Sequence, residues 1–394
     1  MIKKTMLAAA LIFFGASASA QSSITLYGRI DNGVMYEAGL PKGALFGAES
    51  GGYGISWWGL EGSEDLGGGS KAVFKLESGF DGTTGKIYSS SLFGRHATVG
   101  LSNASYGTLK LGNIGVGFVA GDSFDIDPQK FQDYATETLV RGRNWAQAGN
   151  GAEYTSGNLD GLTLEAQYTL TNTPGDWNGC SGSACGTQPS FLGNAQGRAD
   201  GFKAMYDRYN MKLMAIYDEV RDENGQFTNV YDASREVILG GNYTWGPLKA
   251  YVGYELLRAP QATIANQDVT TGAVTGTLPS GISGAPTTVN HGWVGLSYDV
   301  SPFVRFSGAI YHANANNGNG NATLYTLGGN YFLSKRTFLY TELAYVTNSA
   351  TSNVGLGDGF SDAYGPNANE GGTSEAPDYG KSQFGATVGI MHQF

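Results

Sequence analysis

The chain is poor in histidine, cysteine and charged side chains, and it lacks a long hydrophobic run. Its 394 residues include four histidines and two cysteines, which leave little material for a zinc site. Charged residues make up 15% of the chain, and the formal net charge of −10 is opposite in sign to that of nucleic-acid-binding domains. No run of about 18 apolar residues occurs, which excludes a helical membrane span.

Glycine and aromatic residues are abundant instead. The chain contains 61 glycines, about twice the usual share, and 12% of its residues are aromatic. This composition argues against a coiled coil or a helical bundle. The 41% of hydrophobic residues argue equally against a disordered chain.

The first twenty residues have the features of a secretory signal peptide. Lys3 and Lys4 precede a short apolar stretch at 6–15, and the small residues 18–20 (ASA) form a cleavage site that leaves Gln21 as the mature N-terminus. The apolar stretch is too short for a membrane anchor. We therefore predict a signal peptide at 1–20 for export from a bacterial cytoplasm. No linker interrupts 21–394, which we expect to be a single domain.

The mature chain repeats segments of about ten residues in which apolar and polar or small side chains alternate, for example 162–170 and 248–256. This period of two is typical of strands with one apolar face. Short and long connections alternate between the segments, as in outer-membrane barrels. We predict sixteen strands, at 23–36, 51–62, 70–81, 92–101, 107–113, 150–156, 161–170, 199–207, 210–220, 236–244, 247–258, 289–299, 302–313, 322–332, 337–347 and 382–394.

A membrane barrel and a soluble sandwich both explain this alternation. In a sandwich the apolar face is hidden in a core, whereas in a barrel it faces lipid and the polar face lines the lumen. The signal peptide, the strand length and the alternating loops favour an all-β, antiparallel transmembrane barrel. Its sheet must close on itself, because the bilayer core offers no water to unpaired backbone groups. Sixteen strands leave an aqueous channel.

Several stretches resemble the Gram-negative general porins of the betaproteobacterial type. They are 23–31 (SITLYGRID), 59–80 (GLEGSEDLGGGSKAVFKLESGF), 93–112 (FGRHATVGLSNASYGTLKLG), 333–345 (LSKRTFLYTELAY) and 388–394 (VGIMHQF). The resemblance implies a homotrimer of sixteen-stranded barrels, each with its long third loop folded into the lumen. It implies residence among outer-membrane lipid and lipopolysaccharide. The terminal Phe394 resembles the aromatic residue that such barrels present to the barrel-assembly machinery.

The connection 114–149 is too long for a simple turn, and long loops tend to be functional. We interpret it as a constriction loop whose acids face basic residues of the wall; the alternative is a solvated surface loop. Its acidic residues are Asp122, Asp125, Asp127, Asp133 and Glu137. Its basic residues are Lys130, Arg141 and Arg143.

Side-chain parity predicts which wall residues face the lumen. Ile24, Leu26 and Ile30 share the lipid face of the first strand, so Arg29 and Asp31 point inward. By the same parity, we predict an inward orientation for Trp57, Glu61, Lys75 and Glu77.

Arg95 matches an arginine that the family places at the constriction. Parity puts Arg95 on the lipid side, so an inward position requires a bulge or a strand end. For each of these wall residues, the alternative is an ordinary lumen charge far from the narrowest point.

Trp57 and Glu61 stand where anion-preferring members of the family carry basic residues. This exchange argues against an inherited anion preference. Trp57 has two interpretations: a residue that stacks on sugars or aromatic solutes, or an interfacial girdle residue.

No catalytic motif is present, and we expect neither an enzyme nor a cofactor or metal. The spacing of Asp122, Asp125 and Asp127 fits no EF-hand. Cys180 and Cys185 lie in a Gly/Ser-rich loop of an exported chain, which favours a small disulfide over free thiols.

The predicted function is passive diffusion of small hydrophilic solutes and ions through a porin. The alternatives are a substrate-preferring channel, a surface adhesin or phage receptor that uses the long loops, and a barrel enzyme.

Overall fold

The computed structural model describes residues 23–41, 43–87, 91–114, 119–130, 132–140, 151–169, 198–222, 225–231, 233–264, 278–356 and 376–394. The predicted signal peptide, Arg141, Arg143, Cys180 and Cys185 lie outside these residues, as does the side chain of Glu137. Among the described residues, no helix has the length and hydropathy that a membrane span requires.

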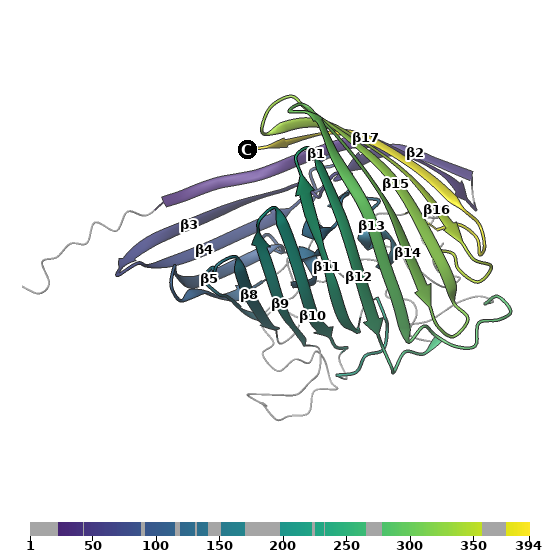
Figure 1. The fold of residues 1–394 in the computed structure, drawn as a ribbon, viewed down its shortest axis with the longest axis horizontal. Helices are drawn as coiled ribbons and strands as arrows, with labels where there is room; N and C mark the ends of the chain where they lie inside the picture. Colours follow the sequence, from purple (N-terminus) through teal and green to yellow (C-terminus); the bar gives the residue numbers. More distant parts are fainter. Residues whose placement is uncertain are drawn as a thin grey trace, which may run out of the picture.

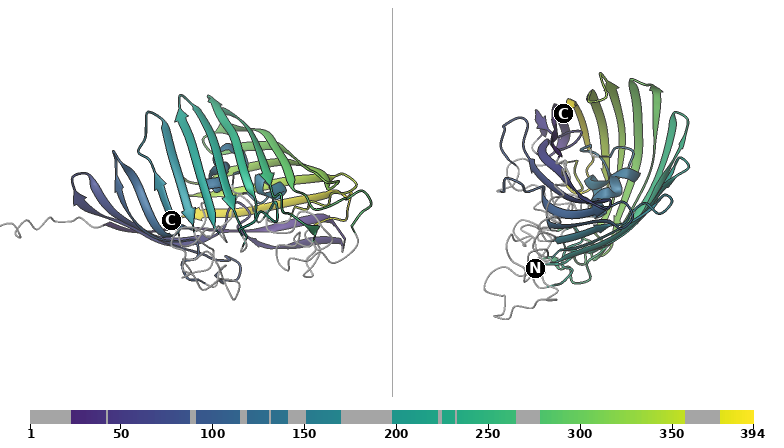
Figure 2. Two further views of the ribbon diagram at one scale, coloured as in Figure 1. Left: turned by 90° about the horizontal axis from the view of Figure 1, so that it is seen from below. Right: turned by 90° about the vertical axis from the view of Figure 1, so that its left-hand side faces the viewer.

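The strands form one antiparallel sheet that closes on itself (Figures 1 and 2). β1 (Ser23–Leu40) pairs on one side with β3 (Trp57–Gly67) and on the other with β17 (Gln383–Gln393). The wall then continues from β3 through β4 (Ser70–Gly79), β5 (His96–Asn103), β6 (Gly107–Asn113), β7 (Gly151–Thr155), β8 (Leu162–Thr169), β9 (Ala199–Arg208), β10 (Met211–Val220), β11 (Arg235–Trp245), β12 (Leu248–Arg258), β13 (Thr288–Ser301), β14 (Val304–Ala315), β15 (Gly320–Phe332) and β16 (Thr337–Asn348) to β17. The predicted closed barrel of sixteen antiparallel strands is confirmed.

An additional strand lies where the sequence predicts a long loop. β2 (Gly43–Ser50) folds back on the second half of β1, with pairs from Asn32–Ser50 to Leu40–Gly43. The prediction missed it because Gly39 and Gly43 interrupt the side-chain alternation; both have positive φ, at 89° and 115°. The predicted strands at 51–62 and 92–101 also begin too early, since β3 begins at Trp57 and β5 at His96.

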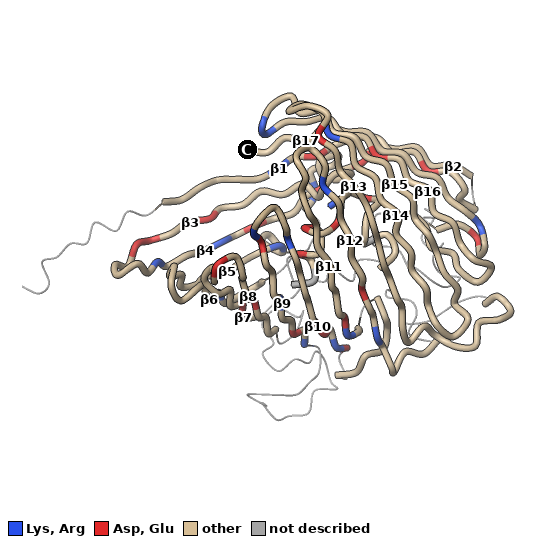
Figure 3. The backbone as a smooth tube through the Cα atoms, viewed as in Figure 1, with Lys and Arg blue, Asp and Glu red and all other residues tan. Residues whose placement is uncertain are grey.

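The two faces of the wall differ as the alternation predicts. In β16, Leu339, Leu343 and Tyr345 are exposed on the outer face, whereas Glu342 and Val346 are fully buried on the inner face. An apolar outer face is what a bilayer core requires. Charged residues are sparse along β13–β16 and more frequent along β3, β4, β9 and β10 (Figure 3).

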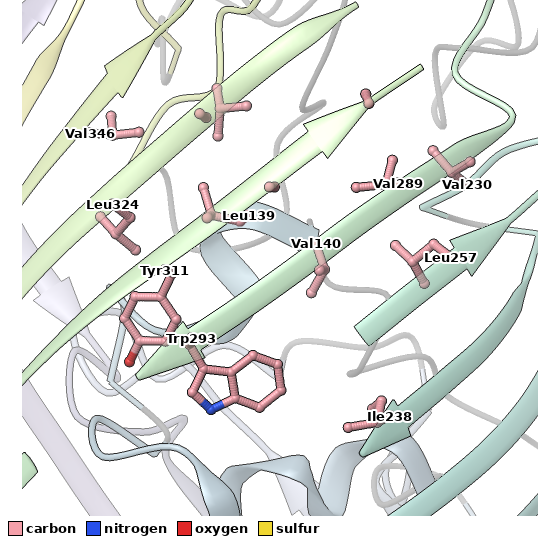
Figure 4. Close-up of a cluster of buried hydrophobic side chains, with 14 of the residues drawn as sticks. Leu139, Val140, Val230, Ile238, Leu257, Val289, Trp293, Tyr311, Leu324 and Val346 are labelled. Carbon is pink, nitrogen blue, oxygen red and sulfur yellow. The ribbon is translucent and has the colours of Figure 1, made fainter. Parts of the chain in front are cut away.

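The interior of the barrel contains a packed apolar cluster. Leu139 and Val140 belong to the short helix α2 (Thr136–Val140), and they lie beside the inward side chains Trp293, Tyr311 and Leu324 (Figure 4). Val230, Ile238, Leu257, Val289 and Val346 extend the cluster. The inner face of β11–β16 is therefore partly apolar, because it packs against residues of the connection between β6 and β7 rather than against water.

Candidate pore constriction

The described part of the connection between β6 and β7 consists of residues 119–130 and 132–140, which we call the interior segment. This segment turns around Asp127, whose side chain is fully buried. Its Oδ1 accepts hydrogen bonds from the Gln129 N–H at 2.8 Å and the Tyr311 hydroxyl at 2.6 Å. Its Oδ2 accepts from the N–H of Thr136 at 2.8 Å and from the Thr136 hydroxyl. Burial raises the pKa of Asp127 above its ordinary value, while these hydrogen bonds act in the opposite direction. Asp127 thus joins the end of the 3-10 helix η1 (Val119–Ile126), the start of α2 and the wall strand β14.

Two wall side chains hold the backbone at the end of η1. The Trp293 indole N–H donates to the carbonyl oxygen of Ile126 at 2.9 Å, and the Asn242 amide donates to the carbonyl oxygen of Asp125 at 2.7 Å. The Trp293 ring lies directly over Gly253 of β12, where any Cβ atom would collide with it. Glycine at this inward position gives the indole the space that it needs to reach the segment.

The next residues of the segment bind β14 and β15. The Ser307 hydroxyl donates to Gln129 Oε1 at 2.7 Å, and Gln129 Nε2 donates to the Thr326 hydroxyl at 2.8 Å. Pro128 packs against Gly295 of β13, where a Cβ atom would lie 2.5 Å from Pro128 Cγ. The segment is therefore fixed to the inner wall by buried polar bonds and by close packing on glycine.

Two loop acids form ion pairs with what we call the lysine wall, Lys203 of β9 and Lys212 of β10. Lys203 pairs with Asp122 and, at 3.2 Å, with Glu165 of β8. Lys212 Nζ lies 2.6 Å from Asp125 Oδ2. The lysine side chains are 6% and 19% exposed, respectively. The positive charges of this wall are thus matched by acids of the segment.

A second charged group lies on β1, β3 and β4 and directly before β5, and we call it the arginine–tryptophan wall: Tyr27, Arg29, Trp57, Lys75, Glu77 and Arg95. Glu77 is at its centre, with a side chain only 2% exposed. Its carboxylate lies 2.5 Å from Arg95 Nε and 3.3 Å from Lys75 Nζ, and it accepts the Tyr27 hydroxyl at 3.1 Å. Two cations and a phenol therefore share one buried acid.

Trp57 connects the aromatic and cationic parts of this wall. Its ring lies edge-to-face with Tyr27, with a centroid separation of 5.0 Å. The guanidinium carbons of Arg29 and Arg95 each lie 5.8 Å from the Trp57 ring centroid. Arg29 is buried and donates from Nε to the Ile55 carbonyl at 2.8 Å, which fixes its side chain beside the ring.

Arg95 reaches the interior because it precedes the regular part of β5. Its N–H still bonds to the Glu77 carbonyl at 3.1 Å, but the register of β4 with β5 begins only at the pair Glu77–His96. Because Arg95 lies outside the regular strand, its side chain does not follow the strand's alternation and contacts the Glu77 carboxylate. This is the strand-end position that an inward Arg95 requires.

The other predicted residues take separate positions. Glu61 is exposed and lies opposite Lys75 in the β3–β4 register. Phe394 lies at the closing seam, where its N–H donates to the Gly28 carbonyl at 3.0 Å and its carbonyl accepts the Gly28 N–H at 3.2 Å.

The sequence reasoning missed Lys203, Lys212, Gln129 and Tyr311. The two lysines could have been found from parity, since each is flanked by outward apolar residues on a predicted strand. Nothing local marks Gln129 or Tyr311, because their partners are remote in the chain. Among the described residues, no group of three or more His, Cys, Asp or Glu side chains could hold a metal ion.

A closed, sixteen-stranded barrel with an apolar outer face and charged interior walls defines the class of outer-membrane channels. The model of the Gram-negative porin family matches residues 7–351. The chain is 31% identical over 382 residues to an outer membrane porin protein of Bordetella pertussis, covering 89% of this chain and 95% of the relative. It is 32% identical over 404 residues to outer membrane porin protein 32 of Delftia acidovorans, covering both chains fully.

A solved structure shows the same fold. The anion-selective porin from Comamonas acidovorans superposes with a TM-score of 0.71 at 24% identity, covering 95% of this chain and 100% of that structure. The chain belongs to the Gram-negative porin family. It is a porin of the bacterial outer membrane, a channel for passive diffusion, and its relatives are channels rather than enzymes.

Proposed function

We propose that the channel narrows where the described residues 119–130 and 132–140 lie beside the arginine–tryptophan wall. The segment reaches toward this wall through Asp133, whose N–H donates to the Gly52 carbonyl at 3.1 Å, a few residues before Trp57. The observation that carries the proposal is the set of buried bonds around Asp127 and Gln129, which holds the segment inside the barrel. An anchored segment of this kind sets the size of the opening.

The ion pairs support a narrow region with weak charge preference. Asp122 and Asp125 balance Lys203 and Lys212. In the arginine–tryptophan wall, Asp31 lies beside Arg29, Glu61 lies opposite Lys75, and Glu77 pairs with Arg95. A ring of unmatched charges of one sign would select ions strongly, whereas matched charges produce a local field with little net sign. We propose that small hydrophilic solutes and ions of both signs pass.

The test is the reversal potential of the refolded protein 21–394 in a planar bilayer under a potassium chloride gradient. We expect a conductance with a reversal potential close to zero. A large potential of either sign would contradict the balanced charges. A folded, heat-modifiable barrel with no conductance would contradict the channel itself and favour a surface adhesin.

We also propose that the protein assembles as a homotrimer in lipid and lipopolysaccharide, and that Phe394 is its assembly signal. The contact of Phe394 with Gly28 at the closing seam supports this role. Deletion of Phe394 should reduce the heat-modifiable, trimer-sized species in cell envelopes, measured by semi-native electrophoresis. Unchanged trimer in the deletion variant would contradict the assembly role, and a monomer-sized wild-type species would contradict the trimer.

A further inference from the structure

We propose that the arginine–tryptophan wall is a binding site for aromatic carboxylates, which the channel therefore retains more strongly than other organic anions. The inference rests on the proposed function, because the solute must enter the lumen to meet the wall. It names a substrate class for a site whose geometry is set by Trp57, Tyr27, Arg95 and Lys75.

The aromatic part of the site is an edge-to-face pair of rings. Trp57 and Tyr27 meet at an interplanar angle of 69°, and both are half-buried on the inner face of neighbouring strands. Edge-to-face rings present both a face and an edge, the two surfaces on which a further aromatic ring packs favourably. Tyr27 is held in place by its hydrogen bond to Glu77. The rings are thus fixed before a solute arrives.

The cationic part of the site lies directly beside the rings. Arg29 and Arg95 lie 5.8 Å from the Trp57 centroid, and Lys75 Nζ lies 5.7 Å from the Tyr27 centroid. Glu77 accepts a hydrogen bond from Arg95 Nε, one of five guanidinium N–H donors, and the Arg95 side chain is 13% exposed. Lys75 is 35% exposed, and its Nζ lies 3.3 Å from the Glu77 carboxylate. A carboxylate near Trp57 would therefore meet N–H donors of both side chains.

The combination of aromatic rings and cations determines which class of solute the site binds best. A simple inorganic anion would use the cations but not the rings, and a neutral aromatic molecule would use the rings but not the cations. An aromatic carboxylate uses both, since its ring can pack on Trp57 or Tyr27 while its carboxylate contacts Arg95 and Lys75. The lysine wall offers no equivalent site, because Lys203 and Lys212 are occupied by Asp122 and Asp125.

The experiment measures block of potassium chloride conductance by sodium benzoate in planar bilayers. Cyclohexanecarboxylate is the matched solute without a π-system, and benzamide is the matched ring without a charge. We expect benzoate to reduce the conductance in a saturable way. Cyclohexanecarboxylate should need a several-fold higher concentration than benzoate for the same reduction, and benzamide should leave the conductance unchanged. Equal block by the two carboxylates, or no saturable block by benzoate, would overturn the proposal.

Variants of adjacent tryptophans provide the structural control. Trp57→Leu should raise the half-blocking benzoate concentration about tenfold, because the variant loses one aromatic contact and one cation–π contact. Trp58→Leu, on the outer face of the same strand, should leave it unchanged. Lys75→Gln should weaken block by both carboxylates, and Trp57→Phe should retain most of the preference for benzoate. Equal effects of the Trp57 and Trp58 variants would overturn the site.

The outcome separates this proposal from the proposed function. Normal potassium chloride conductance without benzoate block would overturn only the aromatic carboxylate site. Loss of conductance from the folded wild-type protein would overturn the channel and the site together. If Trp57→Leu fails to fold, Trp57→Phe and Lys75→Gln still test the site, because they keep a ring or change only a partly exposed charge.

Discussion

The lysine wall and the arginine–tryptophan wall contain the same kinds of charge but arrange them differently. Lys203 and Lys212 each pair with one acid of the wall and one acid of the interior segment, so their charges hold that segment to the barrel. Lys75 and Arg95 instead share Glu77, an acid of the wall itself, and lie beside two half-buried aromatic rings. An additional acid from the interior segment therefore makes a cation an anchor, whereas a cation that pairs only with the wall remains available to a solute.

The most direct way to break the lysine wall is Lys203→Met. This change removes a cation that is 6% exposed and leaves Asp122 and Glu165 facing each other without their shared partner. Loss of one member of a buried ion pair typically costs about 3 kcal/mol. We expect a decrease of that size in the free energy of unfolding, measured by urea titration in lipid vesicles. A decrease below about 1 kcal/mol, the value for an exposed pair, would contradict the anchoring role.

The anchor at Asp127 should make docking of the interior segment dependent on pH. Burial raises the pKa of Asp127, so the docked segment binds the proton more tightly than a released one would. This contribution to docking is fully present below the ordinary pKa of 3.8 and is lost as pH rises through the raised value. The ratio of docked to released forms should change by at most about tenfold per pH unit.

Conductance fluctuations provide the measurement of this pH effect. Open-channel noise from segment motion should decrease as the pH is lowered from about 7 toward the ordinary pKa of an aspartate, about 4. Asp127→Asn, which cannot titrate, should lose the dependence. Noise that increases on acidification in the wild-type protein and not in the variant would contradict the expected direction.

Glu77→Gln tests the difference between the two walls more finely. It removes the negative charge of the arginine–tryptophan wall and keeps the shape of the side chain. Lys75 and Arg95 then lose their shared negative partner. One unit charge acting about 10 Å away through water changes an ion's energy by about 0.4 kcal/mol, or about a factor of two in preference. We expect the permeability ratio to shift about twofold toward anions, measured as the reversal potential in a salt gradient. An unchanged potential would place Glu77 away from the ion path.

The smallest effect on stability should come from Asp125→Asn. The Asp125 side chain is 49% exposed, Lys212 keeps Asp207 at 3.4 Å, and the bond from Asn242 to the Asp125 carbonyl does not involve the side chain. Exposed ion pairs contribute about 0.2 to 1 kcal/mol. The unfolding free energy should fall by no more than this amount. A loss as large as that expected for Lys203→Met would show that the two lysines anchor the segment equally.

The strand alternation predicted the barrel and much of its inner face, because a strand has only two faces and the bilayer fixes which one is apolar. Arg29 and Lys75 follow this rule. Arg95 departs from it because it precedes the register of β5. The apolar inward residues Trp293, Tyr311 and Leu324 also depart from a polar lumen, because they pack on the interior segment.

The side-chain alternation predicted the sixteen-stranded barrel and its outward apolar face, because this local pattern repeats in strand after strand. The resembling stretches predicted membership of a porin family. Which acid meets which base became visible only in the folded barrel. Asp122 meets Lys203 across 81 positions of the chain, and Asp127 meets Tyr311 across 184. Such pairings depend on how the closed sheet brings distant strands around one interior segment, and no local pattern encodes that arrangement.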